Sequence, residues 1–208
     1  MTNMQNNHEI DSIIIDLQYF TCINWIKIWR EYSNLIILSN ETYQKMTFRN
    51  RCVIAGSNGL INLSVPVEEG RNVRLPFQEV KISYKEKWQL QQWRTIVSCY
   101  NRSPWFEYYR DNLEIFFKTE FEYLFQLNME ILRWLSGILK LKLPLIKTSG
   151  ADFDTLDFRN KWLPKNFQEE KGIRYHQLFE ERIGFQTNLS VLDLLFMEGP
   201  NISNILSK

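Results

Sequence analysis

The chain has 208 residues, of which 44% are hydrophobic, and its 25 basic residues nearly balance its 24 acidic ones. This length can bury one sizeable core, and the composition is that of a globular rather than a disordered protein. A formal net charge of +1 lacks the basic excess of a dedicated duplex-binding protein. We therefore expect no nucleic-acid partner.

The ends and the cysteines indicate a cytoplasmic protein. Residues 1–11 are polar and predict a flexible tail before a single domain at 12–208, and no basic segment precedes a long apolar one. The stretch LSGILKLKLPLI is interrupted by Lys140, Lys142 and Pro144, so no membrane span is expected. Three cysteines without metal-type spacing predict buried free thiols and no metal site.

The first elements in chain order form a β-α-β unit. Residues 12–16 predict a buried strand, 23–32 a helix and 35–38 a second strand. Such a connection favours a parallel pair of strands.

A hairpin follows at roughly 46–66, in the run YQKMTFRNRCVIAGSNGLINLSVPV. Its turn, Ser57-Asn58-Gly59, tolerates positive φ. Side chains alternate along a strand, so one exposed face would carry a mainly cationic row, namely Lys45, Thr47, Arg49 and Arg51. The opposite, core-facing row would carry Met46, Phe48, Cys52 and Ile54. An exposed loop at 68–76 and a strand at 80–83 complete this part.

The second half has mainly helical periodicity. A helix from Lys87 would bury Leu90, Trp93, Ile96, Val97 and Tyr100. A helical region would start at Ser103-Pro104 and run to about Lys140, with a break near Thr119.

After these helices the pattern predicts a strand at 145–148 and a last helix that opens at Ser190 and ends at Gly199-Pro200, while residues 150–172 have no clear pattern. The predicted fold is α/β in one domain, with a small mixed sheet, a β-α-β opening, a hairpin and a mostly helical second half.

Several segments together carry a family resemblance. They are QYF from Gln18, YQKMTFRNRC, LSVPV, WRTIVSCYNRSPWFEYY and GFQTNLSVLDLLFMEGP. The chain resembles the WbqC-like family over roughly 15–125 and 175–200. This resemblance implies a protein encoded with bacterial surface-polysaccharide (O-antigen) genes, one that modifies sugars by acyl or aminoacyl transfer. The chain departs from many members at 16–20, where DLQYF replaces a proline-rich turn.

The cationic row is the first candidate binding site. Guanidinium forks bind carboxylate and phosphate, so Arg49 and Arg51 could hold an anion, with Asn50 beside them. The alternative is an ordinary solvated sheet face.

A second candidate lies on the helix that starts at Lys87. Gln91, Arg94, Ser98 and Asn101 recur at three- and four-residue spacing and share a face. Arg94 could orient an anion while Ser98 and Asn101 bind hydroxyls, or the face could be a plain solvated flank. Ser98 is disfavoured as a nucleophile, because no histidine accompanies it in a recognisable motif.

The last helix offers Asn188 as a polar ligand and Asp193 as the most plausible proton acceptor. The alternative for Asp193 is a structural cap and ion pair. No motif identifies a cofactor.

The sequence thus predicts an enzyme, a transferase that modifies an activated sugar, with an arginine-lined concavity for a small anionic or sugar ligand. The alternative is a non-catalytic binding or scaffolding protein of the same pathway.

Overall fold

The structure is a computed structural model that describes residues 12–68, 74–150 and 155–207. The predicted α/β class is confirmed. The tail predicted at 1–11 and the middle of the loop predicted at 68–76 lie outside the described residues. Within the described ranges, no helix has the length and apolar character needed to cross a bilayer.

The β-α-β opening is confirmed. β1 (Ser12–Ile14) and β2 (Asn34–Leu38) pair in parallel, and α1 (Ile23–Glu31) connects them. Ile13 lies opposite Leu35. Their isoleucine-rich sequences are buried, as is typical of parallel strands.

Two short strands extend this sheet, in the order β5-β2-β1-β6. β5 (Leu145–Lys147) confirms the predicted strand at 145–148, while β6 (Leu156–Asp157) lies in the region that sequence alone left unassigned. Both pair in parallel, so the carboxyl ends of all four strands meet at one edge.

The hairpin is shorter than predicted and forms a separate two-stranded sheet. β3 (Arg51–Gly56) and β4 (Gly59–Ser64) pair in antiparallel register, and Ser57-Asn58 forms the turn as expected. The prediction of a strand from residue 46 is wrong. Met46 has a φ of 56°, and the Thr47 hydroxyl donates to the carbonyl of Gln44 at 2.8 Å, so the chain turns there.

The predicted facing is confirmed for Lys45, which is exposed, and for Phe48, which is buried, but it is wrong for three residues between Lys45 and Asn50. Met46, expected in the core, is 64% exposed, whereas Thr47 and Arg49, expected on the surface, are buried. The strand alternation on which the cationic row depends begins only at Arg51.

The three long helices are α2 (Trp88–Tyr100), α3 (Phe106–Lys118) and α4 (Leu124–Leu139). The predicted break at Thr119 is confirmed. The start at Ser103 is wrong, because its hydroxyl donates back to the Tyr100 carbonyl instead of capping α3.

Two further predictions for this part need correction. Residues 80–83, which follow η2 (Phe77–Glu79), do not form a strand. Lys81 and Ile82 instead form isolated β-bridges, each to a different segment. Leu90, expected in the core, is 43% exposed, and Trp88 and Gln92 face inward in its place.

The C-terminal part contains α5 (Glu180–Ile183), α6 (Val191–Glu198), η3 (Gly199–Asn201) and α7 (Ile202–Ile205). The predicted start of α6 is confirmed, because the Ser190 hydroxyl accepts from the Leu192 N–H at 3.3 Å.

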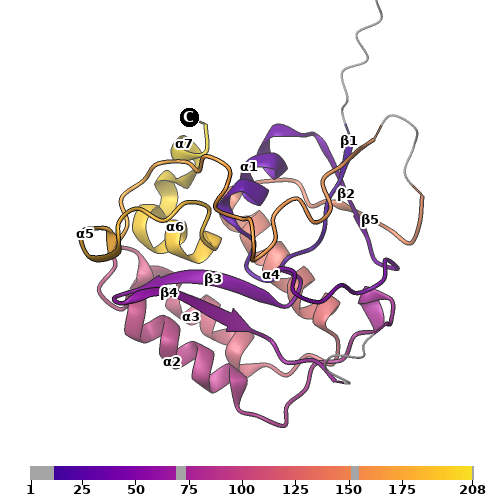
Figure 1. Cartoon of the computed structure of the whole chain (residues 1–208), viewed down its shortest axis with the longest axis horizontal. Helices are drawn as coiled ribbons and strands as arrows, with labels where there is room; N and C mark the ends of the chain where they lie inside the picture. The colour runs from indigo at the N-terminus through magenta and orange to yellow at the C-terminus, as the bar shows by residue number, and fades with distance from the viewer. Residues whose placement is uncertain (1–11, 69–73, 151–154, 208) are drawn as a thin grey trace, which may run out of the picture.

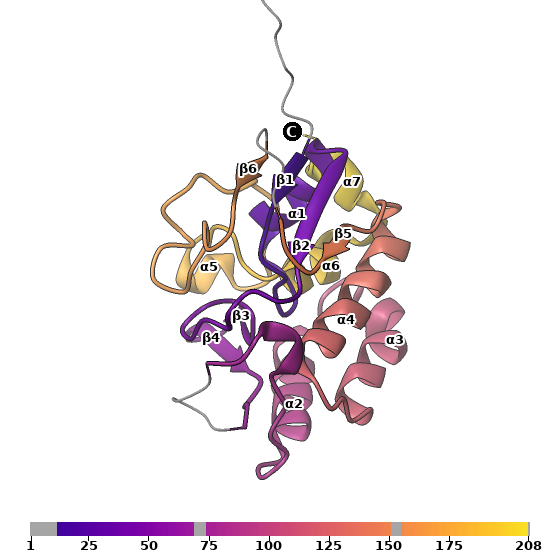
Figure 2. The same ribbon diagram turned by 90° about the vertical axis from the view of Figure 1, so that its right-hand side faces the viewer.

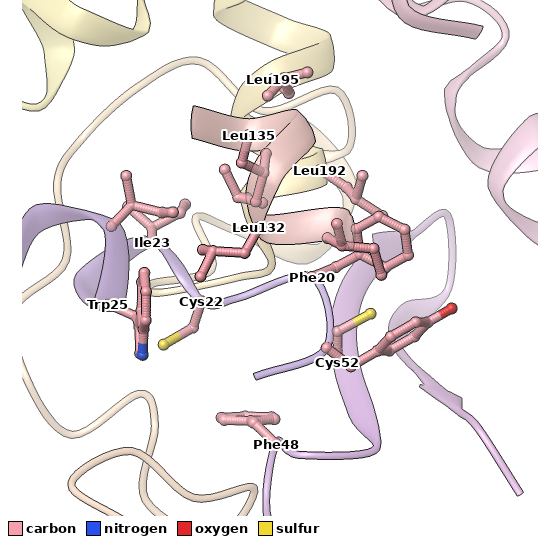
Figure 3. Close-up of a cluster of buried hydrophobic side chains, with 14 of the residues drawn as sticks. Phe20, Cys22, Ile23, Trp25, Phe48, Cys52, Leu132, Leu135, Leu192 and Leu195 are labelled. Atoms are coloured by element: carbon pink, nitrogen blue, oxygen red, sulfur yellow. The ribbon is translucent and has the colours of Figure 1, made fainter. Parts of the chain in front are cut away.

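The core holds these parts together. In Figure 1 the hairpin lies between α2 and α3 on one side and α6 on the other, and Figure 2 shows the parallel sheet at the opposite end from α2. Side chains from α1, α4, α6 and β3 meet in one buried cluster (Figure 3), which includes Trp25, Leu132, Leu192 and Cys52. α6 is buried almost all round, so it fixes the hairpin against α1 and α3.

The cysteines are free thiols, as predicted. Cys22 and Cys52 are buried, and burial raises the pKa of each to about 12. Cys99 is only half-buried.

Candidate functional site

Polar side chains collect at the carboxyl ends of the parallel strands. Asp16 follows β1, Glu41 follows β2, and Arg159 and Asn160 follow β6. This edge of an open parallel sheet is where α/β proteins generally bind ligands. Within the described ranges, no group of side chains suited to a metal ion occurs.

Arg49 occupies the centre of this cluster and is 0% exposed. Its Nε and Nη2 donate to one oxygen of Glu41 at 3.0 and 2.6 Å, and its Nη1 donates to Asn160 Oδ1 at 2.8 Å. Asn160 in turn donates its backbone N–H to Asp16 at 2.8 Å. Arg49 therefore joins the strand ends, and it is absent from the lining of the pockets described below, contrary to the expected exposed row.

The partner carboxylate, Glu41, is itself mostly buried. Burial raises the pKa of Glu41, and the charge and hydrogen bonds of Arg49 act in the opposite direction. Arg159 adds a second, longer ion pair to Glu41 at 3.8 Å. The cluster is thus a compensated charge network inside the protein.

Beside this cluster lies an open pocket of about 590 Å³, which we call the cationic pocket. Its lining residues are Tyr43, Lys45, Met46, Asn50, Arg51, Pro66 and Val67. Two of them are cationic, and none of these described lining residues is acidic. Arg51, the first residue of β3, has a buried Nε–H without a hydrogen-bond partner in the described part of the chain.

Asn50 and Tyr43 add neutral polar groups to this pocket. Asn50 is 8% exposed and donates Nδ2 to the Val65 carbonyl at 2.8 Å. Its Oδ1 is buried and has no partner among the residues described. Burial raises the pKa of Tyr43 to about 12, against the attraction of Arg51 and Arg49, so its hydroxyl stays protonated. The pocket can therefore hold a carboxylate or phosphate.

A second pocket, of about 520 Å³, lies between α2 and the hairpin turn, and we call it the Arg94 pocket. Arg94 and Ser98 line it together with Thr95, Cys99 and Phe179. The predicted polar face of α2 is thus divided, because Gln91 lines a different pocket and Asn101 is the exposed C-cap residue.

The expected convergence of three arginines is therefore wrong. Arg49 is buried in the charge network, Arg51 lines the cationic pocket, and Arg94 lines a pocket that shares no lining residue with it. The predicted binding residues that line these two pockets therefore fall into two pairs: Asn50 and Arg51 line the cationic pocket, and Arg94 and Ser98 line the Arg94 pocket.

The Arg94 pocket does not contain an activated nucleophile. Its hydroxyl groups are on Ser57, Thr95 and Ser98, and its thiol is on Cys99. The described residues that line it include no histidine or carboxylate. Burial, and then the negative charge of Asp193, raise the pKa of Cys99. A protonated thiol and an unassisted hydroxyl are weak nucleophiles.

Asp193 and Asn188 are buried and line neither of these pockets. The two carboxylate oxygens of Asp193 accept from the hydroxyls of Tyr100 and Tyr175, each at 2.6 Å. Asn188 accepts from the Asn24 N–H at 2.7 Å and donates to the Phe167 carbonyl at 2.8 Å. These contacts join α6 and the segment before it to the rest of the core.

Sequence reasoning missed Glu41, Asn160 and Tyr43. A usable signal was present for Glu41, since polar residues that follow parallel strands gather at one edge. No comparable signal exists for Asn160, because β6 has only two residues.

The sequence profile of the WbqC-like protein family matches residues 18–157. The chain belongs to this family. The matched range includes the cationic pocket and α2 but ends before Asp193. No curated protein and no solved structure matches the chain.

The buried charge network yields a stability prediction. Arg49→Ala would leave Glu41 buried without its main counter-charge, and we expect it to lower the free energy of unfolding by about 3–5 kcal/mol. Arg110→Ala removes an exposed ion pair with Glu107 and should change the free energy of unfolding by less than about 0.5 kcal/mol. Urea unfolding measures both, and equal costs would contradict the assigned role of Arg49.

The Asp193 network yields a pH prediction. Burial raises the pKa of Asp193 above its ordinary value of 3.8, against hydrogen bonds from two tyrosines. The folded protein therefore keeps this proton to higher pH than the unfolded chain, and the contribution of Asp193 to stability falls as pH rises above 3.8.

Asp193→Asn cannot titrate, so the unfolding free energy of the wild type relative to this variant should decline over the same pH range. Asp111→Asn, on an exposed position of α3, is the matched control. A pH-independent difference between wild type and Asp193→Asn, measured by urea unfolding at several pH values, would rule out the raised pKa.

Proposed function

We propose that the protein is an enzyme of bacterial surface-polysaccharide (O-antigen) biosynthesis that binds an activated sugar by its phosphate in the cationic pocket. The observation that carries the proposal is the pairing of Arg51 and Lys45 in a pocket whose described lining has no acidic residue. The polysaccharide context is part of the proposal and is what the resemblance to the WbqC-like family implies.

The pocket has the groups that phosphate recognition needs. Arg51 provides a planar fork of donors, Lys45 a second positive charge, and Tyr43 a hydroxyl donor. The backbone before Arg51 is held in place, because the Arg49 carbonyl accepts from Asn128 Nδ2 at 2.7 Å. A cationic side chain at the start of a fixed strand loses little conformational entropy when the ligand binds.

The reaction we propose is acyl or aminoacyl transfer to an amino group of the sugar. The amine nitrogen attacks the carbonyl carbon of an acyl thioester, a C–N bond forms and the C–S bond breaks. The sulfur leaves as a thiolate and takes up the proton that the nitrogen loses. Direct transfer requires positioning and charge stabilisation but no protein nucleophile. This agrees with the unactivated Ser98 and Cys99.

A non-catalytic binding or scaffolding role in the same pathway is the second candidate. It is favoured by the same lack of an activated nucleophile, and by the burial of Asp193 away from both pockets. The two candidates share the anion site and differ in whether a covalent product forms.

The binding test uses a panel of nucleotide sugars, acyl thioesters and oligonucleotides, followed by calorimetric titration of the ligands that raise the melting temperature. We expect nucleotide sugars to stabilise the wild type. Arg51→Ala should weaken their binding about 10- to 100-fold, the effect of losing a charge-assisted contact.

Arg94→Ala and Arg102→Ala are the matched controls, since Arg94 lines the other pocket and Arg102 is exposed beyond α2. Both should bind as the wild type does. Unchanged affinity in Arg51→Ala, or stabilisation by oligonucleotides alone, would contradict the proposed site.

The activity test combines a nucleotide-linked amino sugar with an acyl thioester. Release of free thiol and a matching mass increase of the sugar would support the transferase. Binding of the sugar without either product, together with recovery of a stable protein partner, would support the scaffold.

A further inference from the structure

A third pocket, which we call the edge pocket, adjoins the cationic pocket. It has a volume of about 450 Å³ and runs along β4 beside α2. Asn50 and Pro66 line both pockets, so they are contiguous at the end of β4. In Figure 1 α2 lies beneath β4, and side chains of both elements line the edge pocket.

The lining of the edge pocket is mixed polar and apolar, and its polar side chains are uncharged except for Glu86. Its side chains include Asn62, Ser64, Glu86, Trp88, Gln91 and Thr95. In the described parts of the chain β4 pairs only with β3, so its outer edge also offers backbone donors and acceptors, apart from the Ser64 carbonyl, which accepts from Gln92 Nε2 at 2.8 Å. Amides, hydroxyls, one carboxylate and an indole are groups that can hydrogen-bond and pack against a ring bearing several hydroxyls.

Two buried polar atoms of this lining have no hydrogen-bond partner in the described chain. Asn50 Oδ1 is an acceptor and Trp88 Nε1 is a donor, on side chains that are 8% and 4% exposed. An unpaired polar atom in the interior is unfavourable, and in native proteins such an atom calls for an explanation, of which a bound water, ion or ligand is one. Here the acceptor and the donor belong to two side chains that line the same pocket.

We propose that the two contiguous pockets form one site for a sugar phosphate, a proposal that rests on the function proposed above. The phosphate binds Arg51 and Lys45 in the cationic pocket, and the hydroxylated ring lies in the edge pocket against Trp88 and Gln91. Asn50 stands at the junction of the two parts.

The edge pocket also shares Ile61 and Thr95 with the Arg94 pocket, so it has a cationic neighbour on each side. The phosphate is assigned to the Arg51 side for two reasons. That side has two cations where the other has one, and it shares the buried Asn50 with the edge pocket.

The test is calorimetric titration of the full chain with glucose 1-phosphate and with inorganic phosphate. We expect the wild type to bind glucose 1-phosphate at least about 10-fold more tightly, the effect of about one well-placed hydrogen-bonding group. Gln91→Ala and Trp88→Phe should bring the two affinities together while leaving phosphate binding unchanged. Gln91 is exposed, so replacing its side chain leaves the packing of the core unchanged.

Gln126→Ala, on an exposed position of α4, is the matched control and should keep the wild-type ratio. Arg51→Ala should weaken both ligands, and Arg94→Ala neither. Equal wild-type affinities, or a ratio unchanged in both edge-pocket variants, would overturn this inference while leaving the anion site of the proposed function intact. If Arg94→Ala lost binding and Arg51→Ala kept it, both the assignment of the phosphate to the Arg51 side and the anion site of the proposed function would be overturned.

Discussion

The buried pair between Arg49 and Glu41 is the interaction on which the rest of the structure depends. It joins the segment after β2 to the segment that enters the hairpin, and through Asn160 it reaches the segment after β6. A guanidinium without solvent contact needs this full set of acceptors, because an unpaired buried charge is strongly unfavourable. The carboxyl edge of the parallel sheet is therefore occupied by the protein's own ion pair.

This constraint decides which of the two neighbouring arginines lines an open pocket. Since Arg49 turns inward, Arg51 starts the strand and lines an open pocket, although only one residue separates them. The two arginines have opposite roles for one physical reason. The chain turns at Met46 and becomes extended only at Arg51, so strand alternation does not relate their side chains.

The chemistry available at the pockets is that of binding and orientation. Buried thiols are held protonated, Ser98 has no base in its pocket, and Asp193 is committed to two tyrosines. What the open surfaces offer are cations at Arg51 and Lys45 and neutral polar groups along β4. This surface is the basis of our proposal that the substrate brings its own nucleophile, as an amino sugar does.

The sequence by itself determined the helices, strands and turns that depend on residues close together in the chain. Isoleucine runs, helical periodicity and the Ser57-Asn58 turn correctly predicted β1, β2, α1, the long helices and the hairpin turn. Only the tertiary structure decided which polar side chains meet. Asn160 lies 111 residues from Arg49, and Tyr175 lies 18 residues from Asp193. Periodicity describes neighbours within one element, whereas burial and the pairing of charges depend on which distant segments fold against each other.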